Sequence, residues 1–377
     1  MSTTVYVSRD ASALAMGAER VARALAAEAA RTGADMRIVR TGSRGMFWLE
    51  PLVEVATPAG RIAYGPVQPA AVPGLLAAML QGGAHALRLG AVEDIAYFRN
   101  QQRLTFARVG ITDPLSLDDY RAHGGLRGLA RALDMAPEQI VSVVTESGLR
   151  GRGGAAFPAG IKWKTALDAS GAQKYIVCNA DEGDSGTFSD RMLMEGDPYQ
   201  LIEGMIIAGL AVGATHGFIY LRCEYPHAQR ALQAALATAY ENGLLGASVL
   251  GSGKRFELEL RLGAGAYICG EETSLLDSLE GKRGQVRAKP PLPAIKGLFG
   301  KPTVINNVIT LASVPIILER GAEFYRDYGS GRSRGTLPLQ LAGNIRHGGL
   351  VPPWEKTTDP PARTTPRPDS MWSSSRR

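Results

Sequence analysis

A glycine-rich basic stretch, residues 148–164, holds the residue types best suited to chemistry in this chain. It reads Gly-Leu-Arg-Gly-Arg-Gly-Gly-Ala-Ala-Phe-Pro-Ala-Gly-Ile-Lys-Trp-Lys and carries four cationic side chains. Glycines such as Gly151 and Gly153 let backbone amides approach a ligand closely, and successive amides form a concave anion site that nearby cations strengthen. Phe157 and Trp163 offer flat faces for stacking. The stretch predicts a cradle for a phosphate joined to an aromatic system, as in a nucleotide or flavin. The alternative is a flexible basic surface loop.

Residues Gly151 to Ala156 match the dinucleotide-binding fingerprint Gly-x-Gly-x-x-Ala. The sequence before them, however, differs from that before the usual motif. The fingerprint should follow a strand. Here Pro137 and the apolar positions within 140–144 indicate a helix, and Gly148 stands where a C-terminal cap would. We therefore reject an ordinary Rossmann first turn.

A second polar stretch, Asn-Ala-Asp-Glu-Gly-Asp at 179–184, follows a predicted strand. Buried carboxylates are costly unless they are paired, so Asp181, Glu182 and Asp184 are expected to line an open site. Carboxylates and amides such as Asn179 suit ribose or ribityl hydroxyls and the edges of a flavin ring. A turn followed by a helix cap is the alternative.

Three further features lie in the same half of the chain. Residues 263–273 combine glycines with the adjacent carboxylates Glu271–Glu272, which open a predicted helix, although the helix dipole alone also favours acidic residues there. Lys289 precedes a stiff Pro-Pro-Leu-Pro segment that is either a linker or a support for the lysine over a site. Asn306–Asn307 enter the last predicted helix as caps or as ring contacts. Together these features indicate one binding site.

The composition sets limits on the class of protein. A chain of 377 residues allows two or three domains, and 45% hydrophobic with 21% charged residues is ordinary for a soluble globular protein. No apolar run is long enough for a direct membrane span, and the first residues lack signal-peptide features, so a cytoplasmic location is expected. The net charge of +6 comes without a basic run interleaved with aromatics, which argues against nucleic-acid binding.

The cysteines Cys178, Cys223 and Cys269 are far apart in the sequence. They form neither a disulfide framework nor a metal motif. All three are expected to be inert core residues, and no metal site is predicted.

The element pattern predicts an α/β protein. Residues 1–90 read as strand 4–8, helix 12–31, strand 36–40, a hairpin over 51–64 and helix 72–80, the order of a small thioredoxin-like domain. A helical connector follows over 91–135. Residues 136–330 form a second α/β domain with a parallel sheet, whose ligands should sit beyond the carboxyl ends of the strands. Its predicted strands are 174–179, 217–222 and 256–262, and its predicted helices are 199–212, 227–242, 270–279 and 303–318.

Residues from about 111 to 349 resemble the NADH- and FMN-binding flavoprotein subunit of NADH:quinone oxidoreductase. The same subunit type occurs in NAD-reducing hydrogenases and in cytoplasmic NAD-dependent formate dehydrogenases. The second domain is accordingly expected to be a Rossmann-like FMN/NAD-binding α/β domain. The stretches that carry the resemblance are 148–158, 178–182, 263–273, 289–291 and 301–308.

The resemblance implies roles for individual residues. FMN is held largely through its phosphate by the glycine loop, Lys162 and Asn306–Asn307, while the strand-end residues and Gly270–Glu271 contact its ribityl chain and ring. Phe157 stacks on the NAD(H) base, and Glu272 with Lys289 helps hold that nucleotide. Hydride then moves between nicotinamide C4 and flavin N5, and no side chain is needed as a proton-transfer catalyst. The cofactor-binding set is Gly151, Gly153, Phe157, Lys162, Asn179, Asp181, Glu182, Asp184, Gly270, Glu271, Glu272, Lys289, Asn306 and Asn307.

The variant Asn-Ala-Asp-Glu-Gly-Asp-Ser-Gly-Thr-Phe at 179–188 looks most like the β subunit of a formate dehydrogenase. Ser43 and Phe47 stand where a related [2Fe–2S] domain has cysteine ligands, so this thioredoxin-like domain is expected to lack a cluster. The implied function is an NAD(H):FMN oxidoreductase (diaphorase) subunit. Its implied partners are a molybdopterin/iron–sulfur α subunit and a small [2Fe–2S] subunit. The alternatives are the corresponding subunit of a hydrogenase or of NADH:quinone oxidoreductase, and a catalytically inactive assembly protein.

The end of the chain departs from the family pattern. The family continues past residue 350 into a ubiquitin-like domain and a helical domain whose CxxCxxC and distal cysteine bind a [4Fe–4S] cluster, and those ligands are absent here. Residues 331–350 are expected to begin the ubiquitin-like domain. Residues 351–377, rich in proline, threonine, serine and charge, are expected to be a disordered, non-native tail left by a frame shift or truncation. An aromatic is also usual where Leu292 stands.

Overall fold

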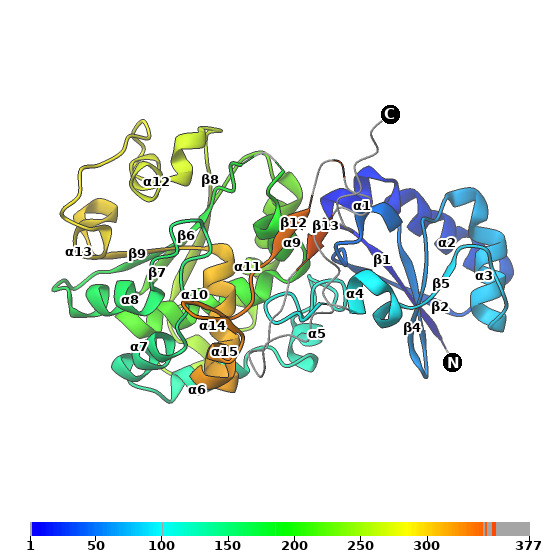
Figure 1. Cartoon of the computed structure of the whole chain (residues 1–377), viewed down its shortest axis with the longest axis horizontal. Helices are drawn as coiled ribbons and strands as arrows, with labels where there is room; N and C mark the ends of the chain where they lie inside the picture. The colour runs from blue at the N-terminus through cyan, green and yellow to red at the C-terminus, as the bar shows by residue number, and fades with distance from the viewer. Residues whose placement is uncertain (1, 100, 185, 342–343, 345–348, 352–377) are drawn as a thin grey trace.

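The computed structural model describes residues 2–99, 101–184, 186–341, 344 and 349–351. Two α/β units lie side by side and are joined by a short helical connector (Figure 1). The tail predicted to be disordered lies outside the described residues, apart from Val351. Before it, two small antiparallel pairs form, β10 (Gly329–Ser330) with β11 (Ser333–Arg334) and β12 (Leu339–Leu341) with β13 (Gly349–Val351).

The first unit is a five-stranded mixed sheet with the order β2-β1-β3-β4-β5. Strands β1 and β2 are parallel, and the other neighbours are antiparallel. The predicted element order is confirmed, with two additions: Gly17, at φ 101°, divides the first helix, and an exposed edge strand, β5, follows α3. Its elements are β1 (Thr3–Ser8), α1 (Ala11–Ala15), α2 (Ala18–Thr32), β2 (Met36–Thr41), β3 (Val53–Thr57), β4 (Gly60–Tyr64), α3 (Val72–Gln81) and β5 (Arg88–Ala91).

The second unit contains an all-parallel sheet with the order β8-β7-β6-β9, which confirms the predicted parallel pairing. Side chains alternate across β6: Ile176 and Cys178 face the main core with helices α10 and α14, whereas Val177 packs in a smaller core with α12. Both α10 and α14 are apolar around most of their circumference and are buried along most of their length. The strands are β6 (Tyr175–Ala180), β7 (His216–Leu221), β8 (Glu257–Leu262) and β9 (Thr303–Asn307), and the main helices are α7 (Pro137–Glu146), α8 (Ala159–Asp168), α9 (Ser189–Gly196), α10 (Pro198–Val212), α11 (Pro226–Glu241), α12 (Glu272–Leu279), α13 (Pro293–Lys296), α14 (Val308–Arg320) and α15 (Ala322–Arg326).

The prediction of one helix over residues 303–318 is wrong. Residues 303–307 are strand β9, and the helix α14 begins only at Val308. β9 pairs in parallel with β6, with Val304 opposite Ile176 and Asn306 opposite Cys178. The β-branched run Thr-Val-Ile packs well on a pleated surface, and the long-range pairing decides its conformation.

The expectation that all three cysteines are core residues is also wrong for one of them. Cys178 and Cys269 are buried, but Cys223 is exposed in the turn after β7. The described residues contain no group of three or more histidine, cysteine or acidic side chains placed to hold a metal ion. In the same part of the chain no helix combines the length and apolar character that a bilayer crossing demands.

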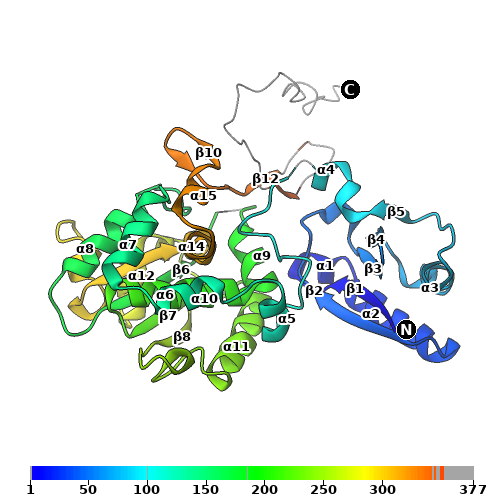
Figure 2. The ribbon, with the colours of Figure 1, turned by 90° about the horizontal axis from the view of Figure 1, so that it is seen from below.

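Glu203 of α10 fastens the connector to the second unit. The connector helices are α4 (Ala96–Arg99), α5 (Leu117–Ala122) and α6 (Arg127–Leu133). In Figure 2, α6 lies beside α10, whereas α4 lies toward the first unit. The buried Glu203 carboxylate accepts hydrogen bonds from the Tyr120 hydroxyl at 2.5 Å and from the Leu126 and Leu129 amides, both at 2.8 Å.

Replacing Glu203 with glutamine should lower the free energy of unfolding by about 1–2 kcal/mol. The reason is that one carboxylate oxygen becomes an NH2 group, which cannot accept a hydrogen bond from the donors around it. Chemical denaturation of the full chain measures the change. The exposed Glu241→Gln at the end of α11 is the control, expected to stay within about 0.5 kcal/mol of the parent. Equal stability of the two variants would contradict the anchoring role.

Candidate functional site

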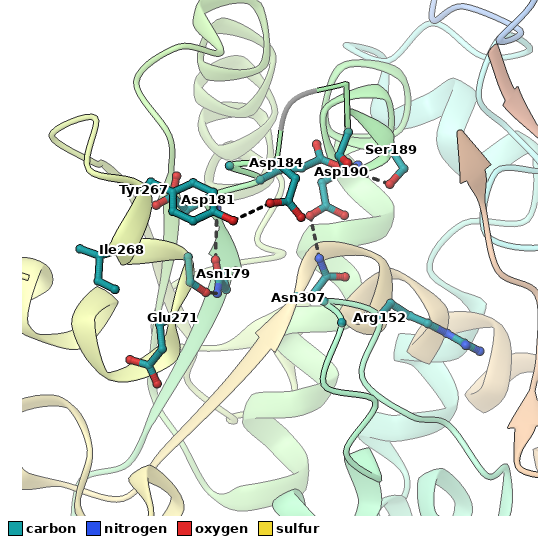
Figure 3. A pocket seen from close by; sticks show the side chains of 16 residues that line it. Arg152, Asn179, Asp181, Asp184, Ser189, Asp190, Tyr267, Ile268, Glu271 and Asn307 are labelled. Carbon is teal, nitrogen blue, oxygen red and sulfur yellow. Dashed lines mark hydrogen bonds between the residues drawn. The ribbon is translucent and has the colours of Figure 1, made fainter. Parts of the chain in front are cut away.

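A hollow of about 460 Å³ opens beyond the carboxyl ends of β6 and β9, where the topology predicts a ligand site (Figure 3). It brings together the tip of the glycine loop, the strand-end segment after β6, the turn before α12 and the start of α14. Most of the predicted site residues lie on its wall. The lining is Arg152, Gly153, Gly154, Asn179, Asp181, Glu182, Gly183, Asp184, Thr187, Ser189, Asp190, Tyr267, Ile268, Gly270, Glu271 and Asn307.

The glycine loop runs between α7 and α8, so it follows a helix as predicted. Its base is closed by the Gly151 amide, which donates to the Phe157 carbonyl at 2.8 Å. The Arg152 amide donates to the Thr310 hydroxyl at 2.9 Å and ties the loop to α14. Gly154 has φ 103°, and a Cβ there would meet nothing within 4 Å, so the loop backbone borders open space.

Close packing disfavours a side chain at position 153. A Cβ on Gly153 would lie 3.2 Å from the Cβ of Asn307, which is tighter than ordinary van der Waals contact. The loop therefore approaches the junction of β9 and α14 without a side chain between them. This leaves a backbone-lined edge that an anionic group can approach.

The prediction that Trp163 stacks on a ligand ring is wrong. Residues 159–168 form helix α8, and Trp163 is completely buried on its inner face. The Trp163 indole donates to the Asn306 Oδ1 at 2.8 Å, which places Asn306 beneath the hollow rather than on its wall. Phe157, by contrast, is 47% exposed and remains available for stacking.

Asn179 and Glu182 hold the strand-end segment in place. The Asn179 side chain donates to the Gly270 carbonyl at 2.8 Å and joins two sides of the hollow. Glu182 accepts from the Asp190 and Arg191 amides at 3.0 and 3.1 Å, and so caps α9 while it lines the hollow. Both sequence interpretations of this segment, an open site and a helix cap, describe parts of the same structure.

Asp190 is a site residue that the sequence analysis missed. Burial, followed by the neighbouring Glu182 carboxylate, raises the pKa of Asp190 well above its usual range. The Asn307 side-chain amide donates to its Oδ2 at 2.7 Å, while the Asn307 Oδ1 accepts from the Ile309 and Thr310 amides. Asn307 thus caps α14, as one of the sequence alternatives proposed, and also carries a hydrogen bond across the hollow (Figure 3).

Tyr267 was also missed, although an aromatic within a glycine-rich stretch is a usable signal. Its ring is 69% exposed, and its hydroxyl donates to Asp184 Oδ1 at 2.6 Å. A Cβ on Gly183 would lie 2.8 Å from this ring, so glycine is needed beneath it.

Arg152 lines the hollow too, but Figure 3 shows its guanidinium turned away from the carboxylates. This guanidinium donates to the Tyr325 hydroxyl and the Arg334 carbonyl.

Four predicted residues form a chain of ion pairs beside the hollow. Lys162 Nζ lies 3.1 Å from Glu272 Oε2, and Lys289 Nζ lies 2.9 Å from Glu272 Oε1 and 3.1 Å from Glu271 Oε1. Burial works against ionisation of Glu272, but Lys162 and Lys289 hold its pKa below the usual range. Glu271 connects this chain to the hollow because it lines the wall and caps α12.

Asp181 should give the protein a measurable pH dependence. Burial raises its pKa to about 6, opposed by Arg222 and reinforced by Glu224. The pKa of an aspartate in the unfolded chain is about 3.9. The folded protein therefore holds this proton more tightly than the unfolded chain does. The resulting stabilisation is complete below about pH 3.9 and is lost as the pH rises through about 6.

Asparagine cannot ionise. When the pH is raised from about 5 to about 7.5, the thermal midpoint of Asp181→Asn should therefore fall less than that of the parent. Thermal midpoints followed by circular dichroism at each pH measure this difference. The surface variant Asp35→Asn is the matched control for the loss of one carboxylate. Parallel pH profiles of parent and Asp181→Asn would contradict the assignment.

The architecture and the site define an α/β module with an open polar hollow at the carboxyl ends of its parallel strands, and comparison with known proteins shows what this module resembles. Residues 144–316 match the family model described as the Nuo51 FMN-binding domain. Every residue that lines the hollow falls within this match. Over residues 144–316, which are less than half of the chain, the protein is therefore similar to the Nuo51 FMN-binding domain.

Individual relatives extend this result. The chain is 50% identical over 253 residues to the NADP-reducing hydrogenase subunit HndC of Solidesulfovibrio fructosivorans, covering 67% of this chain and 51% of that protein. It is 52% identical over 243 residues to an NADH-quinone oxidoreductase subunit of Rhizobium meliloti, covering 64% of this chain and 58% of that protein. The chain thus spans about half the length of the curated relatives it matches.

A solved structure, an NAD+-reducing [NiFe]-hydrogenase in the H2-reduced state, is similar over more of the chain. The similarity has a TM-score of 0.58 at 29% identity and covers 92% of this chain and 58% of that chain. It therefore extends beyond the FMN-binding domain into the first unit.

Proposed function

We propose that this chain is an NAD(H):FMN oxidoreductase module that transfers a hydride between a nicotinamide dinucleotide and FMN. The observation that carries the proposal is the coincidence of the hollow with the family match: a glycine-loop cradle, hydroxyl-binding carboxylates and an exposed aromatic meet inside an FMN-binding domain. Its volume of about 460 Å³ is in the range of small-molecule sites.

The residues present fit FMN. The backbone edge at Gly153 and Gly154, together with the N-terminus of α8, would receive the phosphate. Asn179, Asp181 and Glu271 offer acceptors and donors for the ribityl hydroxyls and the ring edge. Bound FMN supplies the chemistry of hydride acceptance and one-electron release.

The chain's own residues position and enclose the reactants. The exposed Phe157 face can stack on the nucleotide base, and Lys289 lies over Glu271 and Glu272 at the edge of the hollow, where it can pair with a ligand phosphate. Lys162 is held by Glu272 and by the Ile305 carbonyl at 2.9 Å, which presets its position before a ligand arrives. None of these roles requires proton transfer.

We further propose that the module serves a formate dehydrogenase. The support is the form of residues 179–188 and a first unit without cluster cysteines. Ser43, at one ligand position, donates to the buried Glu50 at 2.8 Å, and Phe47, at another, packs edge-on against Phe188 at a ring separation of 5.3 Å. Ser43 forms a hydrogen bond and Phe47 a ring contact, and neither side chain offers a thiolate to iron.

A hydrogenase context is the second candidate, because the similarity to the hydrogenase structure covers 92% of this chain. The partners distinguish the two: co-purification from the native host with a molybdopterin subunit supports formate, and with a nickel–iron subunit supports hydrogen. Recovery with a membrane-bound quinone reductase would assign the chain to that complex instead.

The hydride-transfer proposal is tested by colour. After reconstitution with FMN and removal of free flavin, the chain should be yellow and should bleach when NADH is added without oxygen. A chain that stays colourless after reconstitution supports a non-catalytic assembly role and would overturn the proposal. Bound flavin that NADH fails to bleach would limit the function to FMN binding.

A further inference from the structure

A second cavity of about 370 Å³ lies between the two units, apart from the flavin hollow. One side comes from the first unit, with Arg9, Glu19 and Arg40, and the other comes from α9 and α11 of the second unit. We call this cavity the inter-unit cleft. Its lining is Arg9, Leu14, Glu19, Arg40, Glu195, His227, Arg230 and Ala231.

The cleft is rich in guanidinium groups. Among the described residues, the Arg9 side chain makes no hydrogen bond or ion pair. Arg40 is held in place by Glu19 at 2.6 Å and by the Val7 and Ser8 carbonyls. A guanidinium without a partner in a cavity is a ready contact for an anion, and a second one fixed beside it needs little ordering.

The opposite side adds donors from the second unit. Arg230 Nη2 lies 2.7 Å from His227 Nδ1, so the arginine donates to the imidazole. Burial, followed by Arg230, Arg191 and Arg9, lowers the pKa of His227. Several positive charges therefore lie near one imidazole and disfavour its protonated form. An anion bound among them would offset this repulsion.

Glu195 also lines the cleft without cancelling this field. Its side chain is 3% exposed, and its Oε2 accepts from the Ala11 amide at 2.6 Å. Within the part of the chain that the structure describes, its Oε1 has no hydrogen-bond partner, and Arg191 Nε stands 3.8 Å away. Burial and the nearby Asp10 raise the pKa of Glu195 to about 7, which reduces the negative charge that this carboxyl carries near neutrality.

We propose that the inter-unit cleft binds a small phosphate-bearing anion, with Arg9 and Arg40 from one unit and Arg230 and His227 from the other. The cavity size suits a compact ligand, and phosphate oxygens match the forked geometry of guanidinium groups. Such a ligand would join the first unit to α11 next to Glu195 of α9, a helix whose first residues, Ser189 and Asp190, line the flavin hollow. The site is independent of the proposed hydride transfer.

Calorimetric titration of the full chain, preloaded with FMN, tests this site. The probes are inorganic phosphate, pyrophosphate and ADP at low ionic strength. At least one should bind at one molecule per chain, and Arg9→Gln and Arg230→Gln should each weaken that binding by about tenfold or more. Arg31→Gln, on the exposed end of α2, removes the same charge and should leave the affinity unchanged.

The probes also separate the sources of the phosphate group. Binding of pyrophosphate or phosphate that is lost in Arg9→Gln supports a free phosphate ligand, and binding of ADP alone with the same loss supports a nucleotide. Gly153→Val, which blocks the flavin hollow and is titrated without FMN, should retain the binding, so the result does not depend on flavin occupancy. Absence of binding by all three probes, or binding that both arginine variants retain, overturns the proposal.

Discussion

Replacing Gly153 with valine is expected to weaken FMN binding by about 100-fold or more, equivalent to about 2.8 kcal/mol. The first added atom already lies 3.2 Å from the Asn307 Cβ, and valine adds two methyl groups at this crowded position. Because the loop lies at the surface, the chain can shift locally without unfolding, so the loss should fall on binding. Fluorescence titration of FMN with the purified chain measures it.

The matched control is Gly74→Ala in α3, where a Cβ would meet only His85 at 3.8 Å. This variant changes a glycine far from the hollow and should bind FMN like the parent. Circular dichroism must show that both variants are folded. An affinity for Gly153→Val within about threefold of the parent would show that the loop does not hold the flavin, and would remove the main support for the proposed function.

Replacing Asn307 with alanine should lower the free energy of unfolding by about 1.5–5 kcal/mol, the second large effect we expect. The change removes the side-chain cap of α14, a loss typically worth about 0.5–2 kcal/mol. It also leaves the buried Asp190 without its 2.7 Å donor, which adds about 1–3 kcal/mol. Urea denaturation monitored by tryptophan fluorescence reports this change because Trp163 is buried in the same core.

Asn242→Ala is the matched control. Asn242 follows the exposed end of α11, and its side chain bonds only the Thr238 carbonyl at 2.9 Å among the described residues. Its loss should be within about 0.5 kcal/mol. A double variant, Asn307→Ala with Asp190→Asn, should lose less than the sum of the two single changes, since both act on one hydrogen bond. Full additivity would contradict the Asn307–Asp190 pair.

The pattern of apolar residues was sufficient to predict the parallel sheet of the second unit and the helix before the glycine loop. Strands 174–179 and 217–222 are short β-rich runs separated by long amphipathic segments, and this local information survives in the fold. The glycine loop was found from its composition alone, because few structural roles need so many glycines and cations together. These features depend on neighbours in sequence.

The neighbouring residues Asn306 and Asn307 show what only the tertiary structure decided. Their types marked both as site candidates, but both lie in strand β9, where successive side chains point to opposite faces of the sheet. Asn306 therefore meets Trp163 under the loop, while Asn307 reaches Asp190 across the hollow. Because strand β9 exists only through its pairing with β6, more than a hundred residues earlier, no local pattern could separate the two roles.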